Sequence, residues 1–238
     1  MISSLFHSFF YQPLYNGLIL LIDVMPWLDA GAIIILFTII IKLALFPLSR
    51  KAVLAQAELK TLEPEINQIK EKVKDKQEQS ERIIALYRKN KINPFVSIFL
   101  VLVQFPIIFA LYFIFANSEL PGINTDILYT FIHSPTTLNT FFLGIFDVTQ
   151  KSVFLAVFVG LSSFFQMKLS LPKPASGSNE FVKSMNLQMR YVMPVMISFF
   201  AYQISSAISL YWITSNLFAI GQEMILKKPN QDIPKAQG

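Results

Sequence analysis

The sequence predicts an all-α membrane protein, a five-transmembrane-helix bundle with an N-terminal interfacial helix and a cytoplasmic helical hairpin. Of its 238 residues, 53% are hydrophobic and only 15% are charged, whereas soluble domains carry about 25% charged residues. The apolar residues gather in long runs, and the lysines and arginines gather between some of these runs and not others. These observations together favour a multi-pass membrane protein.

Residues 1–29 predict an outer interfacial helix. The run 14–24 is apolar but too short to cross a hydrocarbon core of about 30 Å, and Pro13 and Asp23 stand at its edges. A signal peptide would need basic residues before this run and a small-residue cleavage site after it, and neither is present. Aromatic residues such as Tyr11 and Trp27 suit the headgroup level of a bilayer.

Five stretches provide the ~17–25 helical residues that a bilayer crossing needs. We place these spans at 30–48, 93–116, 151–171, 189–205 and 206–226. The last two are almost continuous, and Ser205-Ser206 is the plausible turn between them. They are therefore expected to form a tight helical hairpin.

The segments between the spans differ in charge and pattern. Residues 49–92 hold most of the charged residues, and their apolar side chains recur at the spacing of an amphipathic helix. The recurring residues are Leu59, Leu62, Ile66, Ile69 and Val73. A cytoplasmic helical hairpin is favoured here over a merely solvated loop. We further expect an extracytoplasmic loop at 117–150, a cytoplasmic loop at 172–188 and a cytoplasmic tail at 227–238.

The distribution of basic residues predicts the topology, because Lys and Arg favour the cytoplasmic side of short loops. Segments 1–29 and 117–150 contain neither residue, whereas 49–92, the loop after the third span and the tail contain many. The N-terminus is therefore expected outside and the C-terminus in the cytoplasm, with Lys151 as a mild exception. This distribution also accounts for the net charge of +5 without nucleic acid as a partner.

Lys42 lies inside the first span, where a cation costs at least ~2.5–3.5 kcal/mol. It stands eight residues before Arg50, or about 12 Å deeper along a helix. Snorkelling to the cytoplasmic headgroups is one interpretation. The alternative is a water-accessible cavity in which Lys42 provides a fixed positive charge.

Other spans also carry polar groups at mid-depth, and we group them with Lys42 as a candidate substrate groove. Each alone indicates an ordinary interhelical hydrogen bond, worth ~0.6 kcal/mol on average, but several together favour a hydrated groove. No acidic residue lies at the same depth, and the nearest candidate is Glu223. The groups are Thr38, Gln104, Ser162, Gln166, Tyr202, Tyr211, Thr214 and Ser215.

Several other classes of function are disfavoured by the residue types present. The chain has no cysteine and two separated histidines, so we expect no metal, no cofactor and no catalytic residues. An intramembrane protease would need a nucleophile and a base within the spans. A small-molecule transporter typically shows internal repeats, and none is seen. A non-catalytic assembly partner of a membrane complex stays open as an alternative.

Motifs in a fixed order along the chain resemble the YidC family of membrane insertases, which includes mitochondrial and chloroplast relatives. They extend over nearly the whole chain and include Lys42-Leu43-Ala44-Leu45-Phe46-Pro47, Leu62-Glu63-Pro64-Glu65-Ile66, Gln104-Phe105-Pro106, Met193-Pro194-Val195 and Ser209-Leu210-Tyr211-Trp212-Ile213-Thr214. Lys42 occupies the position of the family's groove arginine, and Trp212, a further groove residue, stands where many bacterial members have tyrosine.

The resemblance implies a groove that is open to the cytoplasm and to lipid and closed to the outside. It implies a cytoplasmic hairpin that receives substrates, which are nascent or newly made membrane proteins. Lysine keeps the positive charge of the family's arginine but not its planar fork. The lipid bilayer is a further implied partner, while a Sec translocon and the ribosome stay open as partners. An apolar segment entering lipid would supply the driving force, and the sequence contains no phosphate-binding loop.

Overall fold

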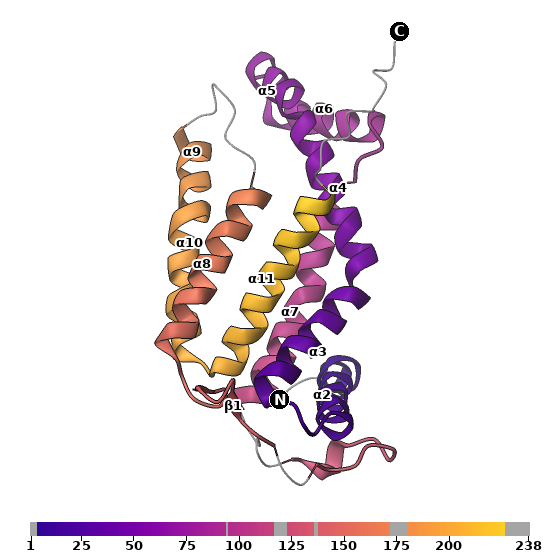
Figure 1. Cartoon of the computed structure of the whole chain (residues 1–238). Helices are drawn as coiled ribbons and strands as arrows, with labels where there is room; N and C mark the ends of the chain where they lie inside the picture. The colour runs from indigo at the N-terminus through magenta and orange to yellow at the C-terminus, as the bar shows by residue number, and fades with distance from the viewer. Residues whose placement is uncertain (1–3, 94, 117–122, 136–137, 172–179, 227–238) are drawn as a thin grey trace.

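The computed structural model describes residues 4–93, 95–116, 123–135, 138–171 and 180–226, and almost all of its regular structure is helical (Figure 1). The helices are α1 Ser4–Phe6, η1 His7–Tyr11, α2 Gln12–Val24, α3 Ala30–Ala44, α4 Phe46–Thr61, α5 Glu63–Lys72, α6 Lys76–Lys89, α7 Phe95–Ala116, η2 Thr125–Ile127, α8 Val153–Ser170, α9 Glu180–Leu187, η3 Gln188–Val192, α10 Met193–Gln203 and α11 Ser206–Leu226. The strands β1 Phe141–Phe142 and β2 Phe146–Asp147 pair in antiparallel register. The expected tail 227–238 and part of the loop 172–188 lie outside the described residues.

Helix lengths and hydropathy agree only partly with the expected spans. Among the described residues, α8 is the helix that is long and apolar enough to cross a bilayer alone. The bent pair of α3 and α4 is long and apolar enough only when the two helices are taken together as one span. The apolar part of α7, Leu102–Phe115, is shorter than that test requires. The count of five spans therefore stays a prediction, as do the expected segment boundaries.

The bend of 66° between α3 and α4 has a local cause. Pro47 has no N–H to donate to a carbonyl in the preceding turn, and its ring crowds that turn. The chain leaves α3 at Leu45, whose N–H still donates to the Ile41 carbonyl oxygen at 3.0 Å, and re-enters a helix at Phe46. The last turn of α3 therefore places Lys42 just before the bend.

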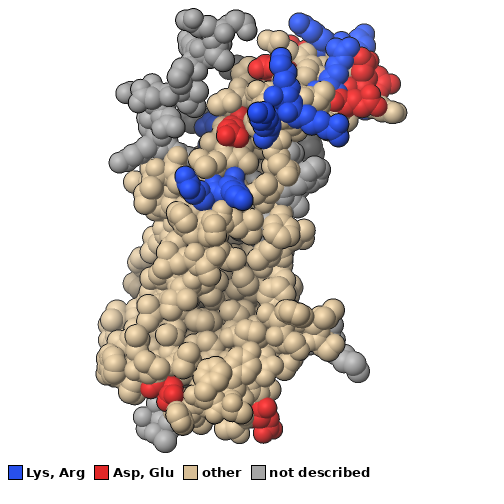
Figure 2. Space-filling model, turned by 90° about the vertical axis from the view of Figure 1, so that its right-hand side faces the viewer, with Lys and Arg blue, Asp and Glu red and all other residues tan. Residues whose placement is uncertain are grey.

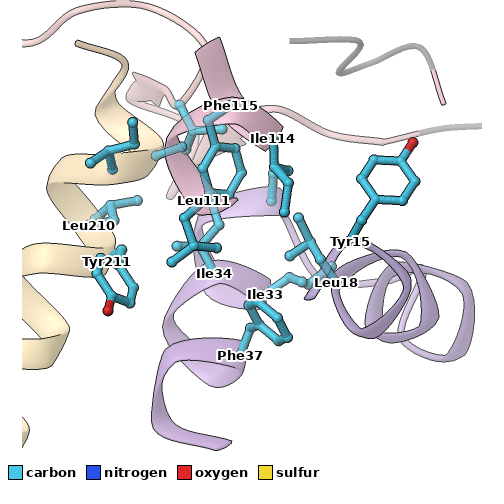
Figure 3. Packing of buried hydrophobic residues seen from close by; sticks show 14 of the residues in the cluster. Tyr15, Leu18, Ile33, Ile34, Phe37, Leu111, Ile114, Phe115, Leu210 and Tyr211 are labelled. Carbon is cyan, nitrogen blue, oxygen red and sulfur yellow. The ribbon is translucent and has the colours of Figure 1, made fainter. Parts of the chain in front are cut away.

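Buried side chains from α2, α3, α7 and α11 form the main core, in the half of the bundle that lies next to α2 (Figure 3). Ile33 and Ile34 of α3 point toward the neighbouring helices, where they meet Leu18, Leu111 and Leu210. α8 and α10 approach each other closely at Gly160 of α8, which has no side chain. A Cβ at this position would lie only 2.9 Å from the Cβ of Ser198 on α10. Small residues at such contacts are what membrane helices use to pack.

α2 lies across the ends of α3 and α7 rather than along them (Figure 1). Asn16 of α2 is only 1% exposed, and its side chain holds α2 against the loop at 123–129. The Asn16 amide donates to the Ile127 carbonyl oxygen at 2.9 Å and accepts from the Tyr129 N–H at 2.7 Å. At the start of α11, Ser206 donates to the Gln150 carbonyl oxygen at 2.6 Å. These bonds hold the described connecting segments against one another at this end of the bundle.

Charged residues gather at the opposite end (Figure 2). On the face shown, lysines and arginines cluster over α5 and α6, a broad band without charge follows, and only acidic residues mark the end near α2. Residues 49–92, expected to form a hairpin, contain most of α4 and all of α5 and α6, and Asp75 accepts from the N–H groups of Gln77 and Glu78 to cap α6. The turn between α5 and α6 covers residues 73–75, because that cap starts α6 at Lys76.

Candidate functional site

The side chain of Lys42 points into the bundle and connects three helices. Its ammonium donates to the Oε1 atom of Gln104 on α7 at 3.4 Å, and the Gln104 amide donates to the Tyr211 hydroxyl on α11. Ser215, one turn further along α11, forms a side-chain hydrogen bond with Tyr211. The amide oxygen of Gln104 accepts a hydrogen bond from the ammonium and, being neutral, does not cancel its charge.

A cavity of about 260 Å³ opens beside this ammonium, between α3, α4, α7, α8 and α11. Its polar lining comes from all five helices, and its apolar lining includes Leu45, Val53 and Phe218. The polar lining residues are Lys42, Ser49, Gln56, Gln104, Gln166, Ser170, Gln222 and Glu223. A cavity of this size with several polar partners can hold water.

Hydrogen bonds join most of the other polar lining residues, within α8 and from α11 to α8 and α4. The Gln166 amide donates to the Ser170 hydroxyl at 2.8 Å, and that hydroxyl donates to the Glu223 carboxylate. The Gln222 amide donates to the Ser49 hydroxyl at 2.8 Å. The cavity therefore contains one cation, one anion and several neutral groups, and it can accommodate a charged or polar chain segment.

Three of the ten predicted groove residues, Lys42, Gln104 and Gln166, line this cavity. Two more do not line it but are linked to its lining, because Tyr211 accepts from the Gln104 amide and Ser215 bonds to Tyr211.

The other five predicted residues lie elsewhere. Thr38 is fully buried and donates to the Ile34 carbonyl oxygen at 2.6 Å. Ser162 accepts from Asn216 at 3.0 Å in the seam between α8 and α11. Trp212 packs partly buried against Ala156, Val159 and Ala201. Tyr202 is 44% exposed on α10, and Thr214 lines a different, apolar cavity.

Four lining residues were missed by sequence reasoning, namely Ser49, Gln56, Ser170 and Gln222. Their signal was present in the sequence. Lys42, Ser49 and Gln56 are seven residues apart, as are Ser215 and Gln222, and a spacing of seven returns a residue to nearly the same face of a helix. Ser49 and Gln56 lie beyond Pro47, where the apolar span was expected to end.

Among the described residues, no group of three or more His, Cys, Asp or Glu side chains could hold a metal ion.

Comparison with known proteins gives consistent similarities. The family described as "60Kd inner membrane protein" matches residues 23–233. The protein named "Membrane protein insertase YidC" from Clostridium tetani is 32% identical over 208 residues, which cover 87% of this chain and 85% of the relative. The protein of the same name from Fusobacterium nucleatum is 33% identical over 199 residues, which cover 83% of this chain and 86% of the relative.

The fold resembles a solved structure described as "Active YidC insertase crystal structure with the first transmembrane domain resolved". The TM-score is 0.57 at 22% identity, and the match covers 92% of this chain. It covers 47% of the solved chain, so this chain spans about half of that protein.

Proposed function

This chain belongs to the 60Kd inner membrane protein family and is a membrane protein insertase, and we propose that it receives its substrates in the polar cavity around Lys42. The observation that carries this proposal is the placement of the Lys42 ammonium, which lies against Gln104 within the bundle and borders a polar cavity. A hydrated cation at this depth attracts the acidic flank of an incoming transmembrane segment.

The strength of that attraction suits transient binding. Two unit charges 4–6 Å apart at an effective dielectric of about 20 attract by roughly 3–4 kcal/mol. This energy lengthens the residence of a substrate and still allows its release. The carboxylate of Glu223 lines the same cavity and is engaged by Ser170.

We propose that the apolar part of the substrate leaves along α7 and α10, the second and fourth of five spans. Both helices present apolar side chains outward, among them Phe105 and Phe109 on α7 and Phe199 and Phe200 on α10. Transfer of an apolar segment into lipid supplies the free energy. The hairpin of α5 and α6 captures the segment first.

The proposed orientation places α5, α6 and the tail in the cytoplasm and α2 with the loop 117–150 outside. It is supported by the basic residues over α5 and α6 and by their absence from residues 1–41. α2 and its flanks act as the outer interfacial helix. Trp27, 74% exposed, then lies at headgroup level, where amphipathic aromatic side chains are favoured.

Complementation of an insertase-depleted bacterial strain tests the proposal. The wild-type chain is expected to restore growth, Lys42→Arg to restore it as well, and Lys42→Ala to fail at equal membrane levels. Lys168→Ala, which removes an exposed lysine that does not line the cavity, is the matched control and should restore growth. Full growth with Lys42→Ala would refute the role of the groove charge.

A further inference from the structure

A second cavity, of about 520 Å³, lies between α3 and α8 with α11 at its back. We call it the phenylalanine crevice, after Phe142, Phe146, Phe154, Phe158 and Phe218 in its lining. Thr214 is its polar member, and the Thr214 hydroxyl donates to the Leu210 carbonyl oxygen at 2.8 Å within α11. The lining therefore offers an occupant apolar contact alone.

The crevice is separate from the polar cavity, although the two share one side chain. Phe218 lines both of them. Leu217 of the crevice and Gln222 of the polar cavity are five residues apart, or about 140° around α11. The crevice also lies away from the proposed exit path, because its walls come from α3 and α8 rather than from α7 and α10.

The hairpin of β1 and β2 closes the outer end of the crevice and is fixed against α3. A Cβ built on Gly31 would lie 2.4 Å from the Phe142 ring, so only glycine allows this contact. The Asp29 carboxylate caps α3 by accepting from the Ala32 N–H at 2.8 Å, and it accepts from the Leu143 N–H at 3.3 Å. The hairpin of β1 and β2 is therefore fixed to α3 and its N-cap residue at two points, Phe142 against Gly31 and Leu143 against Asp29.

We propose that the phenylalanine crevice binds one acyl chain of an outer-leaflet phospholipid whose anionic phosphate lies at Lys151. The cation is the first argument. Lys151 is exposed, it precedes α8 by two residues, and it is the sole Lys or Arg between residues 92 and 167. Phe154 and Phe158, on the first turns of α8, line the crevice directly after it.

The size of the crevice is the second argument. A helix about 10 Å wide that rises 1.5 Å per residue would fit only about one turn into this volume. A helix of another protein would therefore leave most of its length outside. A single acyl chain is narrow, flexible and wholly apolar, and it matches the lining along its length.

An occupied crevice would support the polar cavity. Phe218 separates the two spaces, and an acyl chain on one side holds its ring in place against the other. Binding of an acyl chain requires only that the protein lies in a bilayer. The choice of the outer leaflet rests on the orientation given under the proposed function.

Photocrosslinking tests the site without measuring insertion. The full chain is placed in nanodiscs of phosphatidylethanolamine and phosphatidylglycerol that contain a phosphatidylglycerol with a diazirine in its acyl chain. Labelled residues are identified by peptide mass spectrometry after transfer to detergent and irradiation, so that only retained lipid reacts. We expect label at Ile39, Phe158 and Ile213 severalfold above that at the exposed apolar residues Leu102 and Phe199. Equal label at both sets would overturn the proposal.

Three variants sharpen the test. Leu217→Trp fills the crevice and should remove the retained label, whereas Leu102→Trp, on the exposed face of α7, should leave it unchanged. Lys151→Gln should lower retention about fivefold, because a basic residue near a lipid surface contributes about 1 kcal/mol. Unchanged retention in Leu217→Trp, or crosslinks to a copurified polypeptide in place of lipid, would contradict the site. Since insertion is not read out, these results stand apart from the test of Lys42.

Discussion

At the scale of single residues, the molecule keeps a lysine where hydrocarbon would make it costly. The cost of a central cation is at least ~2.5–3.5 kcal/mol on insertion scales. Gln104 and the polar cavity reduce it by replacing part of the lost hydration. In the proposed mechanism, these surroundings keep the charge of Lys42 available to a substrate.

A liposome insertion assay separates charge attraction from a general loss of function. Two small single-span substrates are compared, one with acidic residues in its translocated tail and one with these changed to Asn and Gln. Lys42→Ala should lower insertion of the acidic substrate by about tenfold or more, since 1.4 kcal/mol is one factor of ten. The neutral substrate should change little. Equal loss for both substrates would indicate that Lys42 acts through structure rather than charge.

Sequence reasoning found the parts of the polar cavity that contrast with their surroundings. A lysine or glutamine within an apolar run stands out, and Lys42, Gln104 and Gln166 do line the cavity. A threonine within an apolar run does not indicate a cavity, because its hydroxyl can donate to the carbonyl oxygen one turn back in its own helix. Thr38 and Thr214 both do this, so a shared helix face could not place them in the groove.

At the scale of elements, hydropathy predicted that the chain is mostly helical, but it did not predict the short irregular elements. The break between α10 and α11 lies at Ile204 and Ser205, at the expected turn. The strands β1 and β2 have two residues each, too few for an alternating pattern to be seen. Their position depends on contacts with Gly31 and Asp29 that are distant in sequence.

Two glycines are expected to respond to alanine in opposite directions. Gly160→Ala puts a Cβ 2.9 Å from that of Ser198 and disturbs the Ser198 bond to the Ala156 carbonyl oxygen, so it should destabilise the fold by about 1–3 kcal/mol. In Gly221→Ala the added Cβ has no atom within 4 Å, so the folded state should be unchanged or more stable by up to about 1 kcal/mol, because alanine favours a helix more than glycine does. Unfolding of each variant in detergent micelles by denaturant measures both. Equal stability of the two variants would argue against close contact of α8 and α10.

The hairpin of α5 and α6 is expected to act as a separate capture element. Gln79 joins its two helices by donating to the carbonyl oxygens of Lys70 and Val73, each at 3.0 Å. Replacing residues 63–90 by a flexible linker of equal length should weaken crosslinking to nascent chains and leave the thermal stability of the remaining bundle intact. Unchanged crosslinking would rule out capture by the hairpin, and a collapsed bundle would show that it is not separate.

At the scale of the whole molecule, charge and packing divide the bundle into two unlike ends. The end near α2 is closed by the bonds of Asn16 and Ser206, and the polar cavity lies toward the end that bears α5 and α6. In the proposed orientation, the cavity admits a chain segment from the cytoplasmic side without opening a pore.

Cysteine labelling tests the orientation of these ends. The chain contains no cysteine, so a single introduced thiol reports without background. Thr125→Cys and Ser80→Cys change exposed residues near opposite ends of the bundle. Because basic residues are retained on the cytoplasmic side, a membrane-impermeant maleimide should label position 125 on intact cells and position 80 only after permeabilisation. The reverse pattern would invert the topology and place the Lys42 cavity on the wrong side to receive cytoplasmic substrates.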